Sequence, residues 1–109
     1  MKEDLTFPDN PIKIGENKEE NDDIIKEAKQ TDIWFHLALF PSCHVIISCS
    51  KKHPIDKTMI QYCAALTKEN TKYRNLKNVK VNYCPIKSVK RTQEKGKVII
   101  KGKIETVAI

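Results

Sequence analysis

Residues 33–49 have the sequence IWFHLALFPSCHVIISC, and this stretch decides the fold. Almost every side chain in residues 33–40 is apolar or aromatic, which predicts a strand that is buried on much of both faces. Pro, Ser and Cys at residues 41–43 interrupt the apolar run, and residues 44–49 form a second predicted strand. The stretch therefore predicts a β-hairpin.

Alternation of side chains along the first strand sorts its residues between two faces. Trp34 and His36 share one face, whereas Phe35 and Leu37 share the other. We expect Trp34 to pack in the core, because its neighbours are apolar. His36 and His44 are expected to lie near each other on the hairpin, either as contacts to a phosphate or base or as a hydrogen-bonded structural pair.

Sequence patterns outside the hairpin predict two helices and further short strands. Apolar residues recur at spacings of three and four from Ile55 to Leu66, which predicts an amphipathic helix from Pro54 to about Asn70. A shorter helix is expected over residues 22–29, with Asn21 as its cap. Alternating apolar and polar residues predict strands at residues 12–14, 79–83, 98–100 and 104–109.

These elements predict an α+β fold. A chain of 109 residues has the length of a single domain. We expect a mostly antiparallel sheet of five or six strands, with one main helix and one short helix packed on one side of it. Residues 1–11 contain Pro8 and Pro11 and are expected to form a flexible N-terminal segment, so the predicted domain covers residues 12–109.

The net charge of +6 hides a division along the chain. Residues 1–36 carry 5 basic and 10 acidic side chains, whereas residues 37–109 carry 15 basic and 4 acidic ones. Such a basic segment is typical of a protein that binds a polyanion such as nucleic acid, although lysines that only solubilise the surface would give the same composition. The high content of Lys, Asn and Ile is typical of an AT-rich genome, such as that of a parasite or a large virus.

Membrane and secretion signals are not visible in the sequence. No apolar run approaches the length of a transmembrane span, and the N-terminus lacks the basic and then apolar layout of a secretory signal. We therefore expect a cytoplasmic protein with no membrane partner and with reduced cysteines. Phosphate-binding loops, dinucleotide-binding fingerprints and nucleophile elbows are also missing, so we expect no enzymatic activity and no cofactor.

A metal or hydrolase site built from His36, Cys43 and His44 is the weaker alternative. Zinc sites usually show two close pairs of ligands, and the four cysteines contain no Cys-x-x-Cys pair. The cysteines are better interpreted as small core residues. We therefore expect no metal.

Basic side chains gather in two segments of the second half of the chain. One segment lies at the end of the main helix and the other between the last strands, and both are predicted to contact phosphates. An exposed Tyr73 or His36 could stack on the bases of a single strand. The predicted phosphate contacts are Lys68, Lys72, Arg74, Lys87, Lys90, Arg91 and Lys97.

Several motifs resemble the NFACT-R domain, the RNA-binding module of the NFACT proteins of ribosome-associated quality control. The matching stretches are IGENKEEND at residues 14–22, DIWFH at residues 32–36 and PSCHVII at residues 41–47, in the order of the family. Residues 89–91 and 96–98 also fit, so the resemblance covers roughly residues 12–107. Two departures stand out, since the family usually has a basic residue in place of Glu16 and commonly Gly-Ser in place of Ser42-Cys43. The second departure is similar to the standalone eukaryotic relatives that carry a C-terminal coiled coil, which these 109 residues do not include.

This resemblance implies RNA binding without catalysis. The partners it implies are tRNA, ribosomal RNA or ribosome-associated complexes, and the basic charge permits DNA as well. The alternative hypothesis is a protein-interaction adaptor that docks an acidic partner through its basic face. The motif residues Asn17, Asn21, His36, Ser42 and His44 join the seven basic residues above as candidate nucleic-acid contacts.

Overall fold

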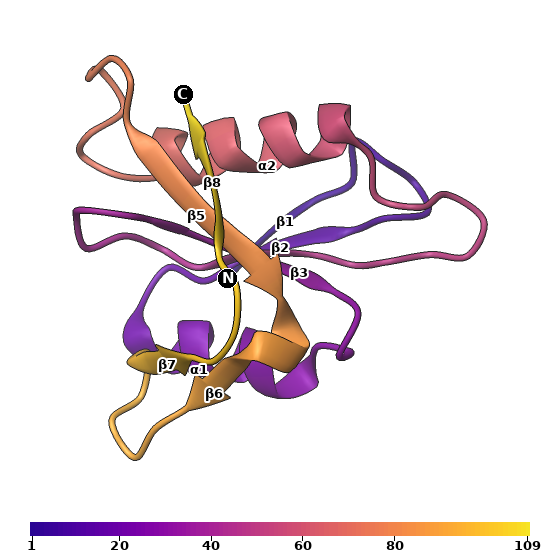
Figure 1. Ribbon diagram of the computed structural model, residues 1–109, viewed down its shortest axis with the longest axis horizontal. Helices are drawn as coiled ribbons and strands as arrows, with labels where there is room; N and C mark the ends of the chain where they lie inside the picture. Colours follow the sequence, from indigo (N-terminus) through magenta and orange to yellow (C-terminus); the bar gives the residue numbers. More distant parts are fainter.

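A six-stranded sheet forms the centre of the computed structural model, which describes residues 1–109 (Figure 1). Its strand order is β1-β2-β4-β3-β5-β8, and every neighbouring pair is antiparallel. The predicted α+β fold with a mostly antiparallel sheet is confirmed. The strands are β1 (Lys2–Asp4), β2 (Ile12–Ile14), β3 (Ile33–Leu37), β4 (Val45–Ile47), β5 (Lys80–Pro85) and β8 (Glu105–Ala108).

The hairpin predicted from residues 33–49 supplies the two central strands β3 and β4. Trp34 pairs with Ile46 and Phe35 with Val45, which fixes the face on which each side chain lies. Strand β3 ends at Leu37 and not at residue 40 as predicted, and the next residues form bends. The apolar composition of this segment was therefore a poor guide to the end of the strand.

Helix α2 (Lys57–Glu69) covers one face of the sheet. It begins after Asp56, whose side chain accepts a hydrogen bond from the backbone N–H of Met59, and not at Pro54 as predicted. Its apolar stripe packs on the face of the sheet that carries Phe35. The buried residues of the core on this face are Ile12, Ile14, Phe35, Leu37, Val45, Ile47, Met59, Cys63, Ala64, Val79 and Val81.

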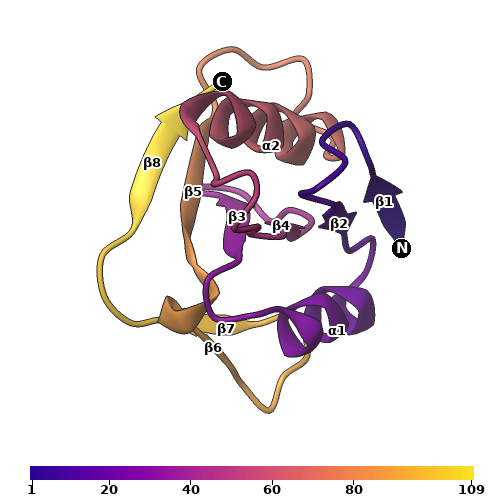
Figure 2. The ribbon, with the colours of Figure 1, turned by 90° about the vertical axis from the view of Figure 1, so that its right-hand side faces the viewer.

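Helix α1 (Lys18–Glu27) covers the opposite face, below the sheet in Figure 2. Asn17 caps it by accepting a hydrogen bond from the backbone N–H of Glu20, so the predicted cap at Asn21 is wrong. The expectation that both helices pack on one side is also wrong. Each face needs a cover because β3 and β4 are apolar on both. The core on this face contains Ile24, Ile25, Trp34, Ile46, Cys84 and Ile86.

A two-stranded ribbon completes the cover beside α1 (Figures 1 and 2). It consists of β6 (Val89–Arg91) and β7 (Val98–Ile100), and a short 3-10 helix (Ile86–Ser88) leads into it. The sequence predicted β7 but not β6. The inward side chains Val89, Val98 and Ile100 pack against the core around Trp34.

Residues 1–11 contribute to the sheet, although they were expected to form a segment outside the domain. Strand β1 pairs with β2 in the register Lys2 to Ile14. Asn10 is buried, and its amide donates hydrogen bonds to the carbonyls of Ser48 and His53 at 3.0 and 2.9 Å. The fold therefore has no boundary at residue 12. None of its helices has the length and apolar character needed to span a membrane.

Candidate nucleic-acid interface

The two histidines of the hairpin lie against each other on the α1 face. Their ring centroids are 5.0 Å apart and their planes are nearly perpendicular. The ring of His36 also stacks in parallel on Trp34 at 5.7 Å. The sequence-based expectation that the histidines are neighbours is confirmed, and Trp34 is a core residue with 3% exposure.

Hydrogen bonds fix the proton on each histidine ring. The indole N–H of Trp34 donates to Nδ1 of His44 at 3.1 Å, so the proton of His44 is on Nε2. Nδ1 of His36 lies 2.6 Å from the carbonyl oxygen of Leu37, which can only accept, so the proton of His36 is on Nδ1.

Burial keeps both rings neutral at physiological pH. Burial and, to a smaller extent, the neighbouring His36 lower the pKa of His44 to about 3. Burial also lowers the pKa of His36. Neither histidine therefore supplies a positive charge for a phosphate.

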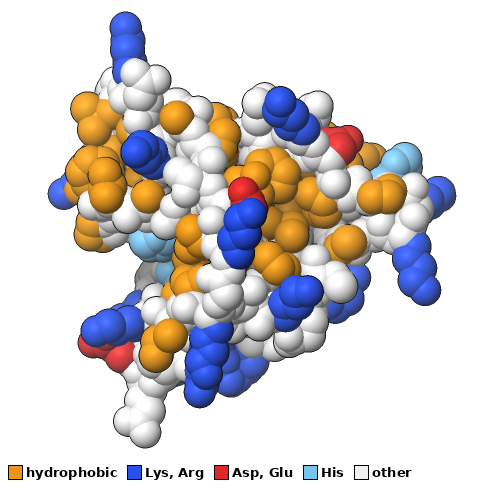
Figure 3. Space-filling model, viewed as in Figure 1, with side chains coloured by type: hydrophobic (Ala, Val, Ile, Leu, Met, Phe, Trp, Pro, Cys, Tyr) orange, Lys and Arg blue, Asp and Glu red, His pale blue; other side chains and the backbone are white.

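A hollow of about 320 Å³ opens beside this pair. Its floor comes from β3 and β5, and its rim comes from Gly96 and Lys97 of the β6–β7 ribbon. Figure 3 shows a hollow on the left-hand side of the molecule, with histidine at its back and Lys or Arg side chains on the parts of the surface above and below it. The hollow is lined by Trp34, His36, Leu37, Ala38, His44, Asn82, Gly96, Lys97, Val98, Ile100 and Ile104.

Basic side chains surround the β6–β7 ribbon. Residues 86–103 contain seven Lys or Arg and one acidic residue. Lys87 and Lys90 are exposed and make no ion pair, so their charges remain available to an anion. Arg91 differs, because its guanidinium donates to the buried carboxylate of Asp22 at 3.1 Å and ties the ribbon to α1.

A second basic group lies on the α2 side of the sheet. Lys72 and Arg74 are exposed in the loop that follows α2, whereas Lys68 is half-buried and donates to the main-chain oxygen of Ile109. Tyr73 stacks on Phe40 with ring centroids 4.1 Å apart, so its ring already has a partner. The predicted basic residues therefore form two groups, with the ribbon group next to the hollow.

Two of the predicted contacts, Asn21 and His44, also have structural roles. Asn21 and His44 are 8% and 2% exposed, and the Asn21 side chain accepts a hydrogen bond from the backbone N–H of His44 at 3.1 Å. A Cβ on Gly15 would lie 2.1 Å from Oδ1 of Asn21, so only glycine allows this approach. Gly15 does not have a positive φ, so the position requires glycine for space and not for backbone conformation.

Ser42 and Asn17 also serve the backbone. The Ser42 hydroxyl accepts from the backbone N–H of Leu37 and donates to the carbonyl of Cys43, which closes the β3–β4 turn. Asn17 is exposed, but its side-chain oxygen is occupied as the α1 cap. The hydrogen bonds of both side chains therefore stabilise local backbone structure.

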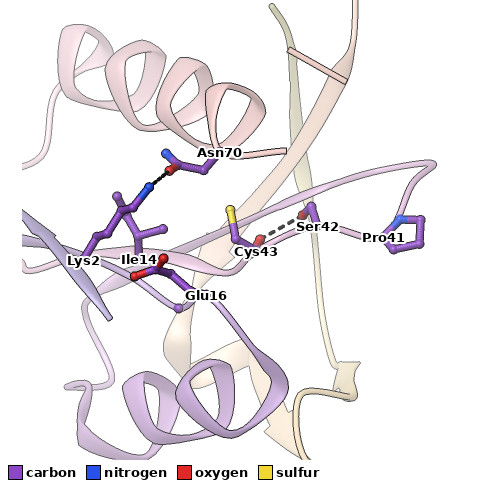
Figure 4. Close-up of a pocket in the computed structure, with 8 residues that line it drawn as sticks. Lys2, Ile14, Glu16, Pro41, Ser42, Cys43 and Asn70 are labelled. Carbon is purple, nitrogen blue, oxygen red and sulfur yellow. Dashed lines mark hydrogen bonds between the residues drawn. The ribbon is translucent and has the colours of Figure 1, made fainter. Parts of the chain in front are cut away.

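A second hollow, of about 390 Å³, lies near the end of α2 (Figure 4). Lys2 donates to Asn70 across it at 3.0 Å, and Glu16 lies on the same wall, so positive and negative charges are balanced there. Burial raises the pKa of the Cys43 thiol to about 11, so the thiol is protonated and a poor nucleophile at neutral pH.

The structure does not bring together the three residues considered for a metal or hydrolase site. Cys43 packs against the α2 core and its thiol donates toward the carbonyl of Thr67 at 3.6 Å, whereas His36 and His44 face α1. No group of three or more His, Cys, Asp or Glu side chains could hold a metal ion.

The comparison with protein families matches residues 6–107 to the model of the NFACT protein RNA binding domain. The chain belongs to this family. It is 36% identical over 87 residues to coiled-coil domain-containing protein 25 of Mus musculus, covering 76% of this chain and 42% of the relative. It is 30% identical over 102 residues to a homologue of that protein from Dictyostelium discoideum, covering 87% of this chain and 49% of the relative. The chain thus spans less than half the length of these relatives.

A solved structure has a similar fold. It is the C-terminal part of the fibronectin/fibrinogen-binding protein from Streptococcus suis, with a TM-score of 0.80 and 26% identity. The match covers 95% of this chain and 42% of the other. The α+β architecture described above is therefore shared with a protein of known structure.

Sequence reasoning missed Asn82 and Asp22. Asn82 lies on β5 directly opposite His36. Its side-chain oxygen Oδ1 accepts a hydrogen bond from the hydroxyl of Thr106 at 2.8 Å. A polar residue in the middle of an alternating strand was the available signal. The contact of Asp22 with Arg91 depends on tertiary structure that the sequence does not show.

Proposed function

We propose that the protein is a non-catalytic RNA-binding module that contacts RNA through the β6–β7 ribbon and the hollow on the α1 face. The observation that carries this proposal is the excess of basic side chains on residues 86–103, seven Lys or Arg against one acidic residue, beside a hollow whose lining includes Trp34, His36 and His44. Lysines would supply affinity through phosphates, and the hollow would accept part of an unpaired nucleotide.

Membership in the NFACT RNA-binding domain family supports RNA as the ligand. We extend the proposal to tRNA, ribosomal RNA or ribosome-associated complexes in the cytoplasm as the source of that RNA. DNA carries the same phosphate charge and is a second ligand that the ribbon could hold.

The second basic group extends the surface. Lys72 and Arg74 are exposed in the loop that follows α2, on the other side of the sheet from the ribbon. An RNA that extends beyond the hollow and around the edge of the sheet would therefore meet a second set of basic side chains. The phosphate contacts that we retain from the sequence are Lys72, Arg74, Lys87, Lys90 and Lys97.

A salt series with structured and single-stranded RNA tests the proposal. Each phosphate contact releases counterions, so we expect the affinity to fall steeply as the salt concentration rises. An absence of binding at low salt, or an affinity that does not depend on salt, would overturn the proposal.

Affinity capture from cell extract, with and without nuclease, separates RNA binding from the adaptor hypothesis. We expect captured ribosomal or tRNA-associated proteins to be lost after nuclease treatment. Direct capture of an acidic protein after complete digestion of nucleic acid would favour the adaptor.

A further inference from the structure

The hollow on the α1 face has the size of a small-ligand site. Its volume of about 320 Å³ lies at the lower end of the range of roughly 300–1,000 Å³ that is usual for such sites. A hollow of this volume has room for one flat ring, such as a nucleobase, but not for a nucleic-acid duplex. Its aliphatic walls favour the faces of such a ring, and they are formed by Ala38, Val98, Ile100 and Ile104.

Three polar side chains form a row across the sheet within this hollow. His36 pairs with Asn82 across β3 and β5, and His44 immediately precedes β4, one residue before Val45, the partner of Phe35. The order across the sheet is therefore His44, His36, Asn82. All three residues line the hollow.

The hydrogen bonds already described leave one unused group on each member of the row. His44 has the N–H of Nε2, a donor, because Trp34 occupies its Nδ1. His36 has the lone pair of Nε2, an acceptor, because its Nδ1 faces the carbonyl of Leu37. Asn82 has its amide N–H groups, which are donors, because its oxygen accepts from Thr106.

The unused group of His44 opens toward the hollow. His44 is 2% exposed, and its Nε2 makes no hydrogen bond within the protein. No buried side-chain nitrogen or oxygen in the structure is both sealed from solvent and unpartnered. The small exposure of this side chain therefore includes Nε2, and the opening that it lines is the hollow.

The row thus presents a donor, an acceptor and a donor. The complementary edge is acceptor, donor, acceptor, which among the four RNA bases is the Watson–Crick edge of uracil with O4, N3–H and O2. Cytosine offers an acceptor where His36 needs a donor. Adenine and guanine do not repeat the order either, and they are larger.

We propose that the hollow holds one unpaired uracil base of the bound RNA, with His36, His44 and Asn82 on its edge and Lys97 near an adjoining phosphate. This inference rests on the proposed RNA-binding function and names the nucleotide that the same surface reads. Sequence-specific readers of single-stranded RNA commonly contact splayed-out bases in this way.

Titration with short homopolymers tests the inference. Oligouridine, oligocytidine and oligoadenosine are compared at one salt concentration by fluorescence anisotropy. We expect oligouridine to bind roughly tenfold more tightly than oligocytidine, which is the usual discrimination of a matched base edge. Trp34 is the only tryptophan and lines the hollow, so its fluorescence is expected to change with oligouridine.

Two variants locate the preference, and one serves as a control. N82D replaces the amide donors with acceptors, and H36L removes the central acceptor, so both are expected to lose the preference for oligouridine. Q61E makes the same amide-to-carboxylate change on the exposed surface of α2 and is expected to keep it. Circular dichroism checks the folding of each variant, and N82D carries the test if H36L unfolds.

The outcomes separate this inference from the proposed function. Equal affinity for all homopolymers, with a normal salt dependence, would overturn base reading and leave RNA binding intact. A uracil preference that survives in N82D and H36L would also overturn it. If no RNA binds to the wild-type protein even at low salt, the proposed function itself fails.

Discussion

The two faces of the central sheet differ in chemistry although the same strands build them. On the α2 face, Phe35 and Val45 have no exposed surface and the core is formed almost entirely of carbon and sulfur. On the α1 face, Trp34 and His44 are also buried, but they are joined by a hydrogen bond and border a hollow. One face therefore only stabilises the domain, whereas the other combines a buried core with polar side chains that border a hollow.

Truncation of the α2 face should have the largest effect on stability. Phe35→Ala removes a side chain with no exposed surface, and we expect the free energy of unfolding to fall by about 3–5 kcal/mol. Urea unfolding measures this. His36→Ala is the matched control, because His36 is the next residue but lies half-buried on the other face. It should lower the free energy of unfolding much less. Equal losses of stability in the two variants would contradict the distinction between the faces.

Acid should destabilise the α1 face through His44. The pKa of His44 is about 3 in the folded protein against an ordinary value of 6.5, because burial disfavours the charged ring. Between these values the unfolded chain binds a proton that the folded protein does not, so stability present above pH 6.5 is lost as the pH falls. The expected loss is about 1.4 kcal/mol per pH unit from this group.

Unfolding measured between pH 7 and pH 5 isolates this effect, because the carboxylates titrate mainly at lower pH. H44Q has no such titration and is expected to show a flatter profile than the wild type, whatever its absolute stability. Since His36 contributes in the same direction, the difference between the two profiles is the relevant quantity. Identical profiles would contradict a neutral buried His44.

Removal of the ion pair between Asp22 of α1 and Arg91 of the ribbon should have a smaller effect on stability. Arg91→Gln leaves the carboxylate of Asp22, which is 6% exposed, without its charged partner, and we expect a loss of about 1–3 kcal/mol. Asp22→Asn combined with Arg91→Gln should recover part of this loss in a double-mutant cycle. Strict additivity of the two substitutions would show that the pair does not interact.

Much of the fold was predictable because its strongest signals are local. Apolar runs identified β3 and β4, and the helical spacing from Ile55 to Leu66 identified α2. Strands β1 and β6 were missed because they are short and rich in charge, with sequences KED and VKR. The placement of α1 was missed because its apolar residues do not indicate which face of the sheet they cover.

The site was predictable only in part. The hairpin register placed His36 beside His44, but it could not show that His44 is buried or that Trp34 determines its proton position. The sequence showed two basic segments, but it could not show that they lie on opposite faces of the sheet, as α2 and the ribbon do. Asn82 required the β3–β5 register, which joins residues far apart in the chain.

Charge reversal on the ribbon tests the central claim most directly. K90E combined with K97E changes two exposed lysines of the ribbon, of which Lys97 lines the hollow. K51E combined with K52E changes two exposed lysines in the β4–α2 loop, so the two double variants have the same net charge. We avoid Arg91 in this test because its pairing with Asp22 would mix stability with binding. RNA affinity is measured for both double variants over the same salt series.

The account predicts that K90E/K97E weakens RNA binding by about 1–3 kcal/mol and reduces the salt slope by about two, while K51E/K52E leaves the slope nearly unchanged. If the two double variants lose affinity equally, or if K90E/K97E binds RNA like the wild type, the ribbon and its hollow are not the RNA-binding face.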